Sequence, residues 1–311
     1  MRIVYEKPAT LEELFSLMKL LPEGPGVKLL AGGTDLLPQL RAGRSGPEAK
    51  ERPILIIADI KRIQEFNGIH ETDKGLFIGA AETMRAVAEH PLVRRYQALA
   101  EGAGRMGCLE IQNRATIGGN ICNGSPSADS LPGLLVYDAK AVIISEAPDG
   151  TAPRERTMPL ERFLLGPGKV DLRPGEALRA VVLPRPPENS QSRYYRRTRV
   201  KGMDLSGINA AIYCESPEPK AGAAAWPAAC GLTGFRIAFG AVWPTVARAR
   251  MAEDILNSEP VTRQSFERAA EAVLADMKPR ESSMRATPDY KRAMIPVLIE
   301  MGISEMGGAS D

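Results

Sequence analysis

The sequence predicts an α+β protein made of two domains. Its 311 residues are enough to form two separate cores. In the first part of the chain, apolar strand-like runs alternate with helical patterns, whereas the second part has strands followed by helices. A proline-rich cluster at 184–187 separates the two parts. We therefore predict domains at 1–186 and 187–311, with the first divided into lobes of about 1–52 and 53–186.

Periodicity and capping residues predict the elements of the first domain. Thr10 and Glu13 form a capping box that begins a helix with apolar residues three and four positions apart. The uninterrupted apolar run 54–58 is typical of a strand buried on both faces, and Pro91 interrupts a helical pattern. The predicted strands are 2–5, 27–30, 54–58, 141–146 and 178–183, with a hairpin of 64–71 and 75–79, and the predicted helices are 11–21, 36–41, 84–106 and 130–137.

The second domain shows the same kinds of pattern in a different order. Its predicted strands are 193–198, 208–215 and 236–242, and its predicted helices are 246–256, 263–277 and 290–301. The segment 216–231, rich in alanine and proline, is predicted to be a loop, and 302–311 a loose tail.

Composition excludes several classes of function. The net charge of +2 is spread along the chain, so we expect no nucleic-acid partner and no membrane-binding patch. No apolar run is long enough to span a membrane and no signal-peptide pattern is present, so we expect a cytoplasmic protein. The four cysteines form no Cys-x-x-Cys pair, and the chain has only two histidines. We therefore predict no metal site, no disulfide and no catalytic residue, and expect any chemistry to come from a bound cofactor.

A first glycine-rich segment follows the apolar strand 27–30. The run Ala31-Gly32-Gly33-Thr34-Asp35 precedes a short helix, and strand, glycine loop and helix together are typical of phosphate binding. The glycines permit close approach of an anion, and the Thr34 hydroxyl adds a donor. Asp35 is interpreted as a cap that accepts backbone N–H bonds or holds the shape of the loop. Taken alone, the segment is more typical of a plain turn between a strand and a helix than of a phosphate site.

A second segment of similar composition runs from Thr116 to Asp129. The Thr116 hydroxyl, the backbone of Gly118 and Gly119, and the Asn120 amide offer donors, and we expect an open loop because glycine is unfavourable in packed elements. Asp129 either accepts bonds from cofactor hydroxyls or caps the helix that follows it. Because two such segments occur in one chain, we predict that both bind a single dinucleotide.

The two segments and several later motifs resemble one family. The residues Ala31-Gly32-Gly33-Thr34-Asp35, 112–120 and Ser125-Pro126-x-x-Asp129 are similar to the FAD-binding medium subunit of molybdenum hydroxylases. That family includes carbon monoxide dehydrogenase, xanthine dehydrogenase and nicotinate dehydrogenase. The runs 194–197, 201–204, 237–249 and 284–291 resemble its C-terminal domain, so the likeness covers nearly the whole chain.

This resemblance implies a fold and a set of cofactor contacts. The fold is a two-lobed FAD-binding domain of the vanillyl-alcohol-oxidase (PCMH) type, followed by a C-terminal α+β domain of the CO dehydrogenase flavoprotein type. Arg196 stands where relatives commonly place a lysine, and Cys122 is interpreted as a small space-filling thiol. The implied FAD contacts are Leu30, Ala31, Gly32, Gly33, Thr34, Asp35, Leu36, Met106, Thr116, Ile117, Gly118, Gly119, Asn120, Ser125, Asp129, Leu178, Tyr195 and Arg196.

The resemblance also implies a function and partners. A large subunit would carry the molybdenum cofactor, and a small subunit two 2Fe–2S clusters, in a dimer of heterotrimers. This chain would pass electrons from those clusters through FAD to NAD+ or another acceptor. Two alternatives stay open at this point: a self-sufficient flavin oxidoreductase of the same fold superfamily, and a non-catalytic nucleotide-binding module. The organic substrate of the complex is not encoded in this chain.

Overall fold

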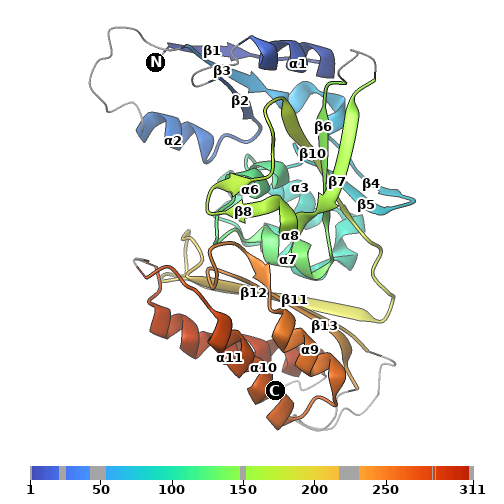
Figure 1. The fold of residues 1–311 in the computed structure, drawn as a ribbon, viewed down its shortest axis with the longest axis vertical. Coiled ribbons are helices and arrows are strands. Elements are labelled where there is room, and N and C mark those ends of the chain that lie inside the picture. Colours follow the sequence, from blue (N-terminus) through green and yellow to red (C-terminus); the bar gives the residue numbers. More distant parts are fainter. Residues whose placement is uncertain are drawn as a thin grey trace.

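The first lobe is built on a small parallel sheet. The computed structural model describes residues 2–20, 26–42, 54–147, 152–216, 231–281, 283 and 285–307. Strands β1 (Arg2–Glu6), β2 (Val27–Leu30) and β3 (Ile54–Asp59) pair in the order β1–β3–β2, with helices α1 (Leu11–Lys19) and α2 (Leu36–Ala42) beside them (Figure 1).

Strand β3 occupies the centre of this sheet, and five of its six residues are buried, as the apolar run predicts. It belongs to the first lobe because it pairs in parallel with both neighbours. The predicted division between the lobes at residue 52 is therefore too early. The capping box at the start of α1 forms only in part, because the Thr10 hydroxyl accepts from Glu13 N whereas the Glu13 carboxylate accepts from Ala9 N.

The second lobe contains a five-stranded antiparallel sheet in the order β4–β5–β10–β6–β7. The predicted hairpin is present, but its first strand begins at Ile69 because 64–66 form a short 3-10 helix. The charged edge strand β7 was not predicted, because its alternation of exposed and half-buried residues carries no apolar pattern. The sheet consists of β4 (Ile69–Thr72), β5 (Gly75–Gly79), β6 (Lys140–Ser145), β7 (Arg154–Pro159) and β10 (Glu176–Leu183).

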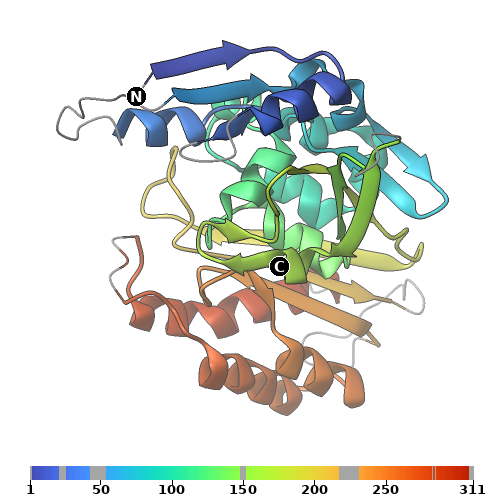
Figure 2. The same ribbon diagram turned by 45° about the horizontal axis from the view of Figure 1, so that its top comes forward.

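The helices of the second lobe form a layer between this sheet and the C-terminal domain (Figures 1 and 2). Pro91 divides the helical pattern of 84–106 as predicted, giving two α-helices separated by a 3-10 helix, Pro91–Arg95. The helices are α3 (Met84–Glu89), α4 (Gln97–Gly104), α5 (Leu109–Gln112), α6 (Ile117–Asn123), α7 (Ser130–Val136) and α8 (Leu160–Phe163), and the hairpin of β8 (Leu164–Gly166) and β9 (Lys169–Val170) follows α8.

The C-terminal domain is a four-stranded antiparallel sheet covered on both faces by helices. Its helices pack against one face, and α4 and α7 of the first domain pack against the other (Figure 1). Neighbouring residues of the strands therefore enter different cores: Tyr194 belongs to the core of the first domain and Tyr195 to that of the second. The elements are β11 (Ser190–Arg197), β12 (Ile208–Glu215), β13 (Thr233–Gly240), β14 (Ala247–Arg248), α9 (Arg250–Ser258), α10 (Arg263–Asp276) and α11 (Pro288–Met306).

Two predictions for this domain are wrong at their boundaries. Helix α9 begins at Arg250 rather than at residue 246, because 247–248 pair with β13. The expected loose tail is helical as far as Met306, since Gly302 packs directly against Ile212 of β12. The predicted loop 216–231 falls almost entirely outside the described residues. Among the helices of the described ranges, none has the length and apolar character needed to cross a membrane.

Candidate functional site

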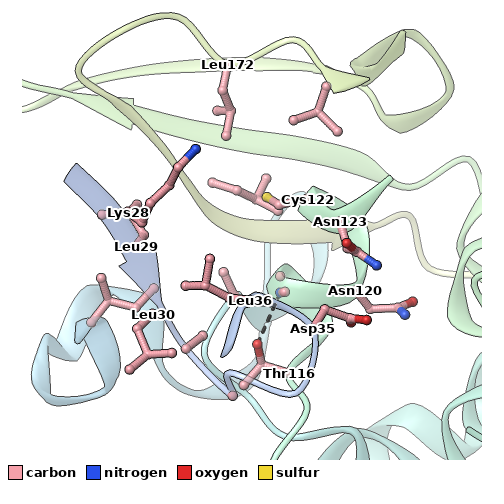
Figure 3. A pocket seen from close by; sticks show the side chains of 18 of the residues that line it. Lys28, Leu29, Leu30, Asp35, Leu36, Thr116, Asn120, Cys122, Asn123 and Leu172 are labelled. Atoms are coloured by element: carbon pink, nitrogen blue, oxygen red, sulfur yellow. Dashed lines mark hydrogen bonds between the residues drawn. The ribbon is translucent and has the colours of Figure 1, made fainter. Parts of the chain in front are cut away.

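Both glycine-rich segments lie on one cavity with a volume of about 680 Å³. Gly33 from the first segment and Gly119 from the second both line it, although they are far apart in the sequence. Figure 3 shows Leu36 and Asp35 beside Thr116 and Asn120 around this space. The predicted residues that line the cavity are Leu30, Ala31, Gly32, Gly33, Thr34, Asp35, Leu36, Met106, Thr116, Gly118, Gly119, Asn120 and Leu178.

The first segment presents backbone donors to the cavity. The backbone N–H groups of Gly32, Gly33 and Thr34 donate no hydrogen bond to any described residue. Gly33 has a φ of +78°, a conformation that favours glycine. A Cβ at Gly32 would overlap the carbonyl oxygen of Arg114, so this glycine lets the first segment pack against the chain just before the second. The segment is therefore shaped to bring free N–H groups next to a ligand.

The expected role of Asp35 as a backbone cap is wrong. Within the described part of the chain, the Asp35 carboxylate makes no hydrogen bond. Only the backbone of Asp35 bonds to helix α2, where its carbonyl oxygen accepts from Gln39 N at 3.1 Å. Burial raises the pKa of the Asp35 carboxyl above its ordinary value. A carboxyl without a partner in a cavity wall is available to a ligand hydroxyl or amide.

The second segment is a helix rather than the open loop that its composition predicts. Helix α6 begins at Ile117, and its first three N–H groups are already bonded within the chain. Ile117 N donates to Glu82 O and Gly118 N to Ala80 O, both at 2.9 Å, and Gly119 N donates to the Thr116 hydroxyl at 3.1 Å. The first N–H groups of α6 are therefore not available to a ligand. This segment contributes mainly to the shape of the cavity.

The two adjacent glycines of α6 have different roles. A Cβ at Gly118 would lie 2.5 Å from Ala80 Cβ and 2.6 Å from Ala80 O, so this position is glycine because the helix contacts the backbone at Ala80. A Cβ at Gly119 would meet only the Thr116 hydroxyl, at 3.0 Å. Gly119 therefore keeps part of the cavity open.

A third wall of the cavity was not predicted from the sequence. The segment 168–176, which contains β9 and ends at the first residue of β10, contributes Gly168, Val170 and Leu172–Glu176. Its glycines and Pro174 could have been recognised as a further irregular segment next to the predicted strand at 178. Lys28 of β2 and Arg173 add positive charge to the lining, and Figure 3 shows Lys28, Leu29 and Leu30 in succession along β2.

Five predicted residues do not line the cavity. Ile117 is fully buried in the core behind α6. The Ser125 hydroxyl accepts from Ser127 N in a turn, at 3.3 Å. The Tyr195 hydroxyl donates to Glu305 of α11 at 2.8 Å, on the far side of the C-terminal sheet. The remaining two, Asp129 and Arg196, contact each other instead, with 3.8 Å between Asp129 Oδ2 and Arg196 Nη1.

Asp129 joins the two domains. It is 3% exposed, and its Oδ1 accepts from the hydroxyls of Tyr194 and Ser206, each at 2.6 Å, and from Asn209 Nδ2 at 3.3 Å. Its side chain makes no capping bond to α7, so the capping interpretation is wrong. The expected bond to cofactor hydroxyls is not favoured, because Asp129 does not line the cavity and its Oδ1 already has three donors. The Arg196 guanidinium is held by the carbonyl oxygens of Arg105 and Asp204.

Cys122 lies in the wall of the cavity, and burial raises the pKa of its thiol to about 12. A thiol with so high a pKa is a poor nucleophile, which agrees with the space-filling interpretation. Among the described residues, Cys108 and Cys122 form no disulfide, and the buried Cys214 thiol donates to Met306 Sδ at 3.6 Å. Cys230 lies outside the described residues. In the ranges that the structure describes, no group of three or more His, Cys, Asp or Glu side chains is placed to hold a metal.

These features fit a flavin dinucleotide. The cavity volume is within the range of about 300–1,000 Å³ that small-molecule sites have. The N–H groups of Gly32–Thr34, which have no acceptor in the described part of the chain, suit the diphosphate. Apolar walls such as Leu29, Leu172 and Leu178 suit the rings, and Gly119 leaves room beside them. The fold and the site together define a dinucleotide-binding flavoprotein.

The chain belongs to the family of FAD-binding molybdopterin dehydrogenase flavoproteins. Residues 1–186 match the FAD binding domain in molybdopterin dehydrogenase, and residues 193–306 match the CO dehydrogenase flavoprotein C-terminal domain. The resemblance in the sequence motifs, the two-domain fold class and FAD as the cofactor are thereby confirmed. The chain is an oxidoreductase component of the xanthine dehydrogenase family.

Individual relatives match over nearly the whole chain. The xanthine dehydrogenase FAD-binding subunit of Escherichia coli O157:H7 is 35% identical over 98% of this chain and 96% of its own. The carbon monoxide dehydrogenase medium chain of Hydrogenophaga pseudoflava is 29% identical over 97% and 96%. A solved structure of carbon monoxide dehydrogenase from that organism, which lacks the Mo-pyranopterin moiety of the molybdenum cofactor, superposes with a TM-score of 0.81 at 29% identity, over 98% of this chain and 96% of its own.

Proposed function

We propose that this chain is the electron-transfer subunit of a molybdenum hydroxylase. In this proposal it receives electrons from the 2Fe–2S clusters of a small partner subunit and passes them through FAD to NAD+ or another acceptor. A large partner carries the molybdenum cofactor, and the cytoplasmic complex is a dimer of heterotrimers. The observation that carries the proposal is the single cavity shared by Gly33 and Gly119. The names of the relatives, a FAD-binding subunit and a medium chain, support the partnership.

The residues of this chain bind and orient the cofactor rather than react. When bound, FAD supplies the chemistry, because it exchanges single electrons with one partner and pairs of electrons with another. The N–H groups of Gly32–Thr34 bind the diphosphate, and the positively charged Lys28 and Arg173 balance part of its charge. The domain boundary at residue 186, and FAD contacts from the predicted residues that line the cavity, are part of this proposal.

The electron path is tested with NADH as the reductant, under anaerobic conditions. We expect NADH to bleach the visible flavin absorption of the purified complex and then to reduce its 2Fe–2S clusters. After removal of FAD, neither change should occur, and adding FAD should restore both. The control is dithionite, which reduces the clusters with or without FAD.

Four outcomes would contradict parts of the proposal. A flavin that NADH cannot reduce would exclude NAD+ as the acceptor. Reduction of the clusters by NADH without FAD would exclude this chain from the electron path. A chain that purifies alone and oxidises an organic substrate would be a self-sufficient flavin oxidoreductase, and one that binds ADP but not FAD would be a nucleotide-binding module.

A further inference from the structure

Lys61 makes a contact behind the first glycine-rich segment. It lies just after β3, in a short 3-10 helix, Ile60–Arg62, whose N-cap is Asp59. Its ammonium Nζ donates to the Ala31 carbonyl oxygen at 2.9 Å and to Asp59 Oδ1 at 2.7 Å. Ile60 lines the cavity but Lys61 does not, so the ammonium group acts from the side of the segment that faces away from the ligand space.

The bond to Ala31 fixes the orientation of one peptide unit. In a trans peptide the C=O and the following N–H point in opposite directions. Because Lys61 holds the Ala31 carbonyl, the Gly32 N–H is directed away from Lys61. That N–H has no acceptor among the described residues, and Gly32 lines the cavity. A glycine-rich segment has many alternative conformations. Fixing one peptide plane before binding therefore reduces the conformational entropy that the segment loses when a ligand binds.

Asp59 holds Lys61 in place and balances its charge. Besides the ammonium group, the Asp59 carboxylate accepts from the Tyr5 hydroxyl at 2.6 Å and from Lys61 N at 3.2 Å. Burial alone would raise the pKa of Asp59, but the bonds from Lys61 and Tyr5 lower it below its ordinary value. The carboxylate is therefore ionised near neutral pH and neutralises the lysine, so Lys61 does not act as a free positive charge for the diphosphate.

We propose that Lys61 is a positioning residue for FAD, which directs the Gly32 N–H toward the diphosphate by holding the Ala31 carbonyl. The contacts from Asp59 and Tyr5 extend this support to β3 and β1. The inference goes beyond the electron path proposed above, because it holds whichever acceptor takes the electrons.

The test compares FAD binding by the full chain and three variants. Lys61→Met removes both bonds of the ammonium group but keeps the apolar stem, and Lys61→Arg keeps a donor. Lys74→Met, in the exposed turn between β4 and β5, is the matched control. We expect Lys61→Met to weaken FAD binding about tenfold, as for the loss of one hydrogen bond to a charged group. Lys61→Arg should bind within about threefold of the parent, and Lys74→Met should bind like the parent.

A second readout separates positioning from general loss of structure. The 31P resonances of bound FAD report the hydrogen bonds of its diphosphate, and we expect them to shift in Lys61→Met but not in Lys74→Met. If Lys61→Met is too unstable to purify, Lys61→Gln, which has a shorter and uncharged side chain, takes its place. Unchanged FAD affinity and unchanged 31P resonances in the Lys61 variant would overturn the inference. A parent chain that binds no FAD would instead contradict the proposed function.

Discussion

Replacement of Gly119 by leucine is expected to weaken FAD binding by more than about 100-fold while leaving the fold intact. A side chain at this position meets only the Thr116 hydroxyl before it enters the cavity, so it competes with the cofactor and not with the protein core. Overpacking against side chains that can adapt costs about 1–3 kcal/mol. The rigid ring system of FAD adapts less than such side chains, so we expect a loss of binding free energy at the upper end of this range. Leucine also has the higher helix propensity. The measurement is FAD affinity by fluorescence titration, together with the thermal unfolding midpoint of the FAD-free chain.

The adjacent Gly118 provides the matched control. Gly118→Ala places a methyl group 2.5 Å from Ala80 Cβ and 2.6 Å from the Ala80 carbonyl oxygen, which is backbone and cannot move aside. We expect this smaller change to lower the unfolding midpoint, with a loss of about 1–3 kcal/mol in the free energy of unfolding. If Gly119→Leu lowered the midpoint as much as Gly118→Ala, or bound FAD normally, the different roles assigned to these glycines would be wrong.

Asp129→Ala is expected to lower the free energy of unfolding by about 3 kcal/mol or more. The change removes the acceptor shared by Tyr194, Ser206 and Asn209. The buried Tyr194 and Ser206 hydroxyls would lose the acceptor to which they donate, whereas Asn209 Nδ2 keeps Ala128 O and the Tyr194 hydroxyl. Because these three residues belong to the C-terminal domain, the loss should fall on the contact between the domains. Urea unfolding followed by circular dichroism measures it.

Two further variants make this second prediction specific. Asp129→Asn keeps the size and one oxygen acceptor, so we expect a smaller loss than for alanine. Ser206→Ala removes one donor only and should cost about 1 kcal/mol. An Asp129→Ala chain that is as stable as Ser206→Ala, but has lost FAD, would show that Asp129 serves the cofactor rather than the domain contact.

Local sequence patterns predicted those parts of the fold that local forces determine. The apolar run of β3 indicated a strand buried on both faces, and Pro91 marked the break between α3 and α4. The first glycine segment indicated an irregular backbone, and glycine is needed there for close packing at Gly32 and for a positive φ at Gly33. In each of these cases, the residues that carry the pattern lie within a few positions of the element or turn that the pattern predicts.

Features that depend on distant partners could not be predicted in this way. Helix α6 contains two glycines with low helix propensity, and it forms because Glu82 and Ala80 accept its first N–H groups. The direction of the Asp129 side chain depends on Tyr194 and Ser206, which lie 65 and 77 positions away. The wall at 168–176 carried a glycine and proline signal, but only the folded chain places it on the same cavity as the first glycine segment.

In the proposed site, the two glycine segments bind the same FAD molecule. An experimental structure of the full chain with FAD tests it most directly. We expect the diphosphate within hydrogen-bond distance of the Gly32–Thr34 N–H groups, with the cofactor passing over Gly119. A flavin bound elsewhere, with the cavity between Gly33 and Gly119 empty, would contradict the account.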